Sequence, residues 1–170
     1  MKKVAIVAVI LVASLSAFQV SAQKFGYVDM QEIISNMPET AKADTALTNY
    51  RQDLYEQIQN MQKEFQDNAN KFITDSATLS DAVKEVKRDE LRDQQNRLMN
   101  FQQTSSQKVQ QKNQELLDPI IKKAQGAVTE VAKAKGYTWV FNDSGDGVLM
   151  VKPDGDDLTA AVKAKLGISK

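Results

Sequence analysis

The sequence contains no cysteine and no histidine, and it is poor in glycine and proline. Without histidine and cysteine, the chain lacks the commonest general base, the thiol nucleophile, the usual zinc ligands and any disulfide. Asp, Glu, Lys and Ser remain, so composition alone does not exclude an enzyme. Seven glycines and three prolines in 170 residues, with 26% charged residues, favour long solvated helices over a compact enzyme.

Motifs for cofactors and metals are also missing. No glycine-rich phosphate loop is present, so the sequence gives no support for the use of ATP. The segment from Asn142 to Gly147 partly matches a calcium loop, but the twelfth position would be Pro153 instead of a glutamate. A hairpin turn is the preferred interpretation of this segment. We therefore expect no catalytic, cofactor-binding or metal-binding residues.

The first 22 residues have the pattern of a secretory signal peptide. Two lysines follow Met1, an apolar run extends from Val4 to Leu15, and small residues occupy Val20 to Ala22. This pattern predicts cleavage after Ala22 and a mature chain outside the cytoplasm. An uncleaved membrane anchor is the less favoured alternative, because the apolar run is short for crossing a bilayer.

The mature chain is predicted to be almost neutral. The whole sequence has 22 basic and 22 acidic residues, and removal of Lys2 and Lys3 with the signal peptide leaves 20 against 22, a net charge of −2. A protein with this balance has no electrostatic footprint for nucleic acid. We therefore expect no nucleic-acid partner.

The middle of the mature chain has the heptad spacing of an antiparallel two-helix coiled coil. Pro38 suits the first position of a helix that extends to about Ile73, and a second helix is predicted from Asp81 to Lys135. The Ser, Thr and Asp residues between the two helices suit a turn and an N-cap. The predicted seam consists of Leu54, Ile58, Met61, Phe65 and Phe72 on the first helix, and of Leu98 and Phe101 on the second.

Three further residues of this hairpin have predicted roles. Pro119 cannot donate a hydrogen bond to Glu115, so it predicts a kink or a restart of the second helix and a hinge. The preceding stretch from Gln102 to Glu115 is the least apolar part of the hairpin. Tyr50 and Tyr55 lie off the seam, so they are candidate contacts with another molecule. The seam itself is interpreted as hairpin core in preference to a binding stripe.

The two ends of the mature chain predict a small β-containing base. Strands are expected at Lys24 to Asp29, Tyr137 to Phe141 and Val148 to Val151, with a brief helical turn at Met30 to Ser35 and a terminal helix from Asp156 to Leu166. These strands are too few to close a core within one chain, so we predict an oligomer assembled through the base. The residues assigned to this contact are Tyr27, Trp139, Phe141 and Leu149.

The predicted fold class is therefore α+β, with a long antiparallel two-helix arm on a small β base. Residues 1–22 form the signal peptide and residues 23–170 form one domain. Within that domain the base comprises 23–37 and 119–170, and the arm comprises 38–118.

Several short motifs at the two ends resemble the Skp/OmpH family of periplasmic chaperones. They are Gly26-Tyr27-Val28-Asp29 before the Pro-started helix, Pro119-Ile120-Ile121 to Ala127-Val128, Val131-Ala132-Lys133, and Gly136-Tyr137-Thr138-Trp139-Val140-Phe141-Asn142. The resemblance implies a jellyfish-shaped homotrimer whose three arms enclose a cavity. It also implies that unfolded outer-membrane proteins are held there without ATP and without catalysis. Tyr50 and Tyr55, proposed above from their position off the seam, are then the candidate client contacts.

The chain departs from the family pattern in its charge. Members of the family are often strongly basic, whereas this chain carries −2 after removal of its signal peptide. The family's lipopolysaccharide site needs clustered basic residues, but Ser105 to Gln111 offers only Lys108, so that site is not carried over. Peripheral contact with membrane lipids remains an expectation. The alternative to a chaperone is an exported coiled-coil scaffold protein of the cell envelope.

Overall fold

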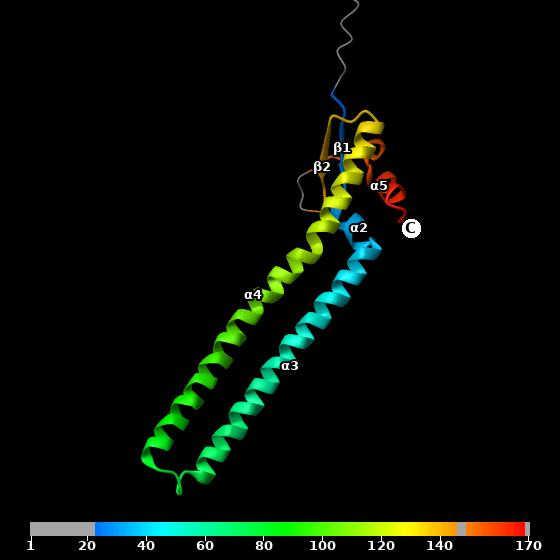
Figure 1. The fold of residues 1–170 in the computed structure, drawn as a ribbon. Helices are drawn as coiled ribbons and strands as arrows, with labels where there is room; N and C mark the ends of the chain where they lie inside the picture. The colour runs from blue at the N-terminus through cyan, green and yellow to red at the C-terminus, as the bar shows by residue number, and fades with distance from the viewer. Residues whose placement is uncertain (1–22, 146–148, 169–170) are drawn as a thin grey trace, which may run out of the picture.

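The computed structural model describes residues 23–145 and 149–168. The signal peptide and its cleavage after Ala22 lie outside the described residues. Two long antiparallel helices, α3 (Pro38–Asp75) and α4 (Asp81–Ala134), form an arm that projects from a small base (Figure 1). The base contains β1 (Phe25–Val28), α2 (Met30–Ser35), β2 (Trp139–Asn142), the 3₁₀ turn η1 (Asp154–Asp156), α5 (Thr159–Lys165) and the C-terminal end of α4.

Local signals explain where these helices begin and end. Asp29 caps α2, because its Oδ1 accepts a hydrogen bond of 2.8 Å from the backbone N–H of Glu32. Pro38 occupies the first turn of α3, where its missing N–H costs nothing. After α4, Gly136 adopts a left-handed φ of 74°, and the N–H of Tyr137 donates to the carbonyl of Ala132 at 2.9 Å. Such a left-handed glycine ends the helix and returns the chain toward the base.

The main core lies in the base. Its largest fully buried side chains are Val28, Ile33, Met37, Leu158 and Val162, each no more than 2% exposed. Small residues of α4, including Ala124 at 0% exposure, pack against the same cluster. The core therefore joins both ends of the chain to the root of the arm, and most of the arm's length lies outside it.

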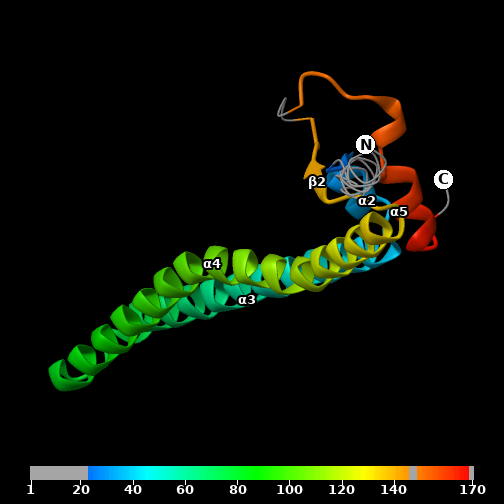
Figure 2. The same cartoon turned by 90° about the horizontal axis from the view of Figure 1, so that it is seen from above.

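The arm has a thin seam with few buried residues. Of the predicted seam residues, Leu54 is 6% exposed and the other six are half-buried. Leu47, one heptad before Leu54 on α3, is 7% exposed. A cross-helix hydrogen bond of 3.2 Å from Asn68 Nδ2 to Gln94 Oε1 marks the register of the two helices. The pair curves gently along its length (Figure 2). Two helices that face each other through one narrow apolar stripe can bury only a few side chains completely.

The sheet differs from the predicted one in its third strand. β1 and β2 pair in parallel, with Phe25 opposite Trp139 and Tyr27 opposite Phe141, so the expected meeting of the two chain ends is confirmed. The strand predicted at Val148 to Val151 is wrong for 149–151, which contain no strand; Val148 lies outside the described residues. The turn predicted at 142–147 therefore does not join two strands of a hairpin. Residues 146 and 147 of this turn also lie outside the described residues.

The other edge of β1 is occupied by a later segment. The N–H of Leu158 donates to the carbonyl of Tyr27 at 2.9 Å, and Tyr27 forms an isolated bridge with Asp157. Gly26 sits under the ring of Tyr137, where an added Cβ would lie 2.8 Å from a ring carbon. Any larger residue at position 26 would therefore force the ring of Tyr137 or the backbone beneath it to shift.

Two predicted helix boundaries need correction. α4 continues through Pro119 without a break, so the predicted restart is wrong. Pro119 is exposed, and water can therefore hydrate the carbonyl that the proline leaves without a donor. The terminal helix begins at Thr159 instead of Asp156, because residues 154–156 form the separate 3₁₀ turn.

Candidate interaction surfaces

The base exposes aromatic side chains along its small sheet. Phe25, Trp139 and Phe141 are 49%, 55% and 41% exposed. The rings of Phe25 and Phe141 stack with centroids 6.3 Å apart. Three large aromatic side chains left partly in water beside a two-stranded sheet form the kind of apolar patch that marks a protein contact.

Residues 149–151, which follow β2 in the chain, also expose apolar side chains. Met150 and Val151 are 97% and 82% exposed, and Leu149 is half-buried. Of the residues assigned to the oligomer contact, Trp139 and Phe141 are exposed on β2, and Tyr27 is half-buried on β1. Leu149 is not on a strand. Phe25, Met150 and Val151 are exposed as well but were not among the residues predicted from the sequence, although Phe25 alternates with Tyr27 along the predicted strand.

A salt bridge anchors this exposed segment to the sheet. Lys152 Nζ pairs with Asp143 Oδ2, and the Asp143 side chain is only 3% exposed. The hydrogen bond to Asp143 raises the pKa of Lys152 above its usual value. Nearby, desolvation and then the charge of Asp157 raise the pKa of Tyr27. Both effects disfavour the ionised phenolate.

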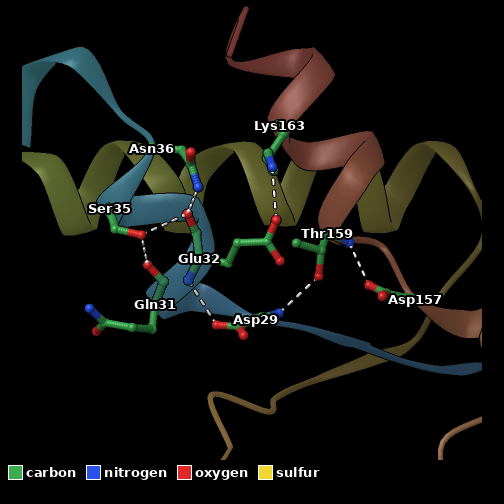
Figure 3. Close-up of polar contacts among 8 residues, drawn as sticks. All are labelled: Asp29, Gln31, Glu32, Ser35, Asn36, Asp157, Thr159 and Lys163. Atoms are coloured by element: carbon green, nitrogen blue, oxygen red, sulfur yellow. Dashed lines mark hydrogen bonds and ion pairs between the residues drawn. The ribbon is translucent and has the colours of Figure 1, made fainter. Parts of the chain in front are cut away.

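A polar network ties the first and last helices of the base together (Figure 3). The N–H of Asp29 donates to Thr159 Oγ1 at 2.9 Å, and the N–H of Thr159 donates to Asp157 Oδ1 at 2.8 Å. The largely buried Lys163 donates to Glu32 Oε1 at 2.8 Å. These contacts fix α5 against α2, so the base holds its two chain ends in a defined position.

The root of the arm carries a second ion pair beside an apolar groove. Lys123 of α4 pairs with Glu39 of α3, and this hydrogen bond lowers the pKa of Glu39. The groove, of about 410 Å³, is lined by Leu116, Pro119 and Ile120 among others. The predicted hinge residue, Pro119, therefore lies next to an ion pair that links the two helices.

The two tyrosines proposed as contacts differ in their surroundings. Tyr50 is half-buried, with the ammonium of Lys112 on the opposite helix 6.0 Å from its ring centroid. Tyr55 is 57% exposed. Tyr50 thus takes part in the hairpin through a cation–π contact, and Tyr55 is the one that offers most of its ring to solvent.

The seam residues occupy the interface between the helices to different degrees. Leu54 is buried, and the other six are half-buried. Sequence reasoning missed the exposure of apolar side chains near the tip and along α4. The exposed residues are Ile73, Val83, Val86 and Met99. Exposure of this kind depends on the exact angle at which two helices face each other, which a heptad pattern does not specify.

The described residues offer neither a metal centre nor a membrane span. No group of three or more acidic side chains within 23–145 and 149–168 is arranged to hold a metal ion. In the same part of the chain, no helix combines the length and the apolar character needed to cross a membrane.

Comparison with known proteins assigns the family. No curated protein matches the chain. A crystal structure of a candidate outer membrane chaperone (OmpH-like) from Caulobacter crescentus superposes with a TM-score of 0.71 at 14% identity, over 86% of this chain and 85% of that one. At this identity the likeness concerns the fold. The model of the family described as outer membrane protein (OmpH-like) matches residues 24–166. The chain therefore belongs to the OmpH/Skp-like family of outer membrane protein chaperones, which is a non-enzymatic family.

Proposed function

We propose that this protein is an ATP-independent periplasmic holdase that binds unfolded outer-membrane proteins and prevents their aggregation. The observation that carries the proposal is a long arm with a thin seam on a base that holds almost the entire core. An arm of this length adds little to a globular core, so its use is to reach around another molecule. Binding the unfolded state lowers its free concentration and thereby suppresses aggregation by mass action.

The proposed assembly is a homotrimer joined through the base. The exposed aromatic side chains Phe25, Trp139 and Phe141 support it, because a charged or polar face would not need a partner. Tyr27 and Leu149 are proposed to lie at the edge of the same contact. Three arms, each comprising residues 38–118, would then extend from one base formed by 23–37 and 119–170 and enclose a cavity.

The arm is proposed to bind clients through many weak contacts. The half-buried seam residues, from Ile58 to Phe72 on α3 and Leu98 and Phe101 on α4, leave part of their apolar surface in water. Tyr55 offers an exposed ring, and Tyr50 is proposed as a second, weaker contact. Pro119 is proposed as the hinge at which the arm adjusts to clients of different size. Peripheral contact with membrane lipids would be secondary, because the mature chain lacks a basic excess.

The test is the turbidity of a urea-unfolded outer-membrane barrel protein after dilution, with and without the mature chain from residue 23. A holdase keeps the client in solution in the absence of ATP at near-stoichiometric amounts. A pull-down from envelope extract should recover many unfolded barrel proteins. Recovery of one or two folded envelope proteins, with no effect on turbidity, would instead identify an exported scaffold.

A further inference from the structure

A cavity of about 270 Å³ lies between α3 and α4 near the tip of the arm. Phe72, Leu79 and Leu91 form its apolar walls, and the side-chain amides of Asn68 and Gln94 line its polar part. Charged side chains line its rim as well: Lys71, Asp75, and Lys87, whose Nζ pairs with Glu90 Oε2 at 2.6 Å. The three apolar residues are half-buried, so each keeps some surface that another side chain could cover.

The cavity exists because the seam is interrupted. Phe65 and Phe72 are one heptad apart, and the intervening seam position is Asn68 instead of an apolar residue. Asn68 and Gln94 hydrogen-bond across the gap at 3.2 Å, which holds the helices in register without filling the space with carbon. A polar pair at a seam position specifies register at a cost in packing. The cost here is an open volume at the end of the arm.

The size and lining of the cavity favour one aromatic side chain with a polar tip. A dry cavity of about 150 Å³ accommodates a benzene ring, so this volume admits a single phenol ring but not two. Phe72 can meet such a ring edge to face. The amides of Asn68 and Gln94 can exchange hydrogen bonds with a phenol hydroxyl. A tyrosine side chain satisfies all of these features together.

We propose that the tip cavity binds a tyrosine side chain of an unfolded outer-membrane strand. This inference rests on the proposed holdase function. Strands of outer-membrane barrels carry aromatic residues at both membrane interfaces, so an unfolded client presents this side chain repeatedly. Ile73, Val83 and Val86 near the tip are 69%, 41% and 57% exposed. They supply apolar surface for the residues that neighbour the bound tyrosine.

The test uses N-acetyl-tyrosinamide as the probe and the full mature trimer as the receptor. Titration should shift the side-chain amide NMR signals of Asn68 and Gln94 in a saturable way, with dissociation in the millimolar range expected for so small a ligand. N-acetyl-leucinamide should cause smaller shifts at the same signals. Leu91→Phe fills the cavity and should remove the response. Leu116→Phe makes the same change on α4 at the root of the arm, outside the cavity lining, and should retain it.

A second variant guards against misfolding of Leu91→Phe. Leu79→Ala removes one wall from the turn without entering the helical seam, and it should weaken the response at least about threefold. Equal responses in Leu91→Phe and Leu116→Phe, or shifts spread evenly along the arm, would overturn the proposal. Concentration-dependent shifts without the probe would point to tip-to-tip association and also overturn it. If the wild-type protein suppresses client turbidity while the cavity signals stay fixed, the cavity proposal fails and the holdase function stands. If turbidity is not suppressed, the holdase function itself fails.

Discussion

Shortening the arm should separate client holding from assembly. The hydrogen bond between Asn68 and Gln94 gives the register of the two helices, so residues 66–72 of α3 lie opposite 90–96 of α4. Deletion of both segments removes one matched heptad from each helix and preserves the phase of the seam. Deletion of 59–65 together with 97–103 removes the next matched pair.

The size of the effect follows from helix geometry. α3 has 38 residues, which corresponds to a reach of about 57 Å at a rise of about 1.5 Å per residue. Each matched heptad removes about 10 Å of reach, or about a fifth of the arm. No residue of the main core lies in the deleted segments, so the base should fold and assemble as before. The amount of client held in solution should fall at least in proportion to reach, and further with the second deletion.

The assay combines the turbidity of a diluted, urea-unfolded barrel protein with light scattering of each variant. The two single deletions are matched controls for each other, because they shorten the arm equally while only the first removes the tip cavity. Equal losses would assign holding to reach, and a greater loss in the first would assign part of it to the cavity. If the most shortened variant remains trimeric and protects the client as well as the full chain does, the arms do not hold the client and the mechanism is wrong.

Three further predictions concern the base and the hinge. Trp139→Glu places a charge in the proposed contact and should raise the dissociation constant of the proposed trimer at least about 30-fold. Light scattering measures this change, and a wild-type protein that is monomeric at micromolar concentration would contradict the trimer. Because Lys123 lowers the pKa of Glu39, their pair stabilises the fold above the ordinary glutamate pKa of about 4.3, and that contribution is lost as the pH falls through the lower folded-state pKa. The Tm advantage of wild type over Glu39→Gln should thus shrink as the pH is lowered from neutral to below about 4.3 and vanish once Glu39 is protonated in the folded state; an advantage that stays constant into strong acid would rule out the ion pair as its source. Hydrogen exchange should be at least about tenfold faster across 102–115 than across 128–134 if Pro119 separates a mobile arm from a firm base; uniform protection along α4 would exclude the hinge.

The sequence by itself determined the helical hairpin. Helix hydrogen bonds connect residues four apart, so the signals that start and stop a helix are local and can be read directly. Pro38 and Gly136 marked the beginning of α3 and the turn after α4. The heptad steps from Leu54 indicated which face would be covered. The family motifs at the two ends also lay in the sequence, and the match over residues 24–166 confirms that resemblance.

Only the tertiary structure decided the sheet, because a strand needs a partner that the local sequence does not name. Tyr137 to Phe141 and the segment from Val148 had similar β-forming composition, yet β2 found β1 and 149–151 found no strand partner. The helix restart predicted at Pro119 is wrong because solvent on the exposed side can replace the hydrogen bond that the proline removes. The volume left at the tip beside Asn68 depends on the distance and angle between the two helices, which the pattern of residues along the chain does not specify.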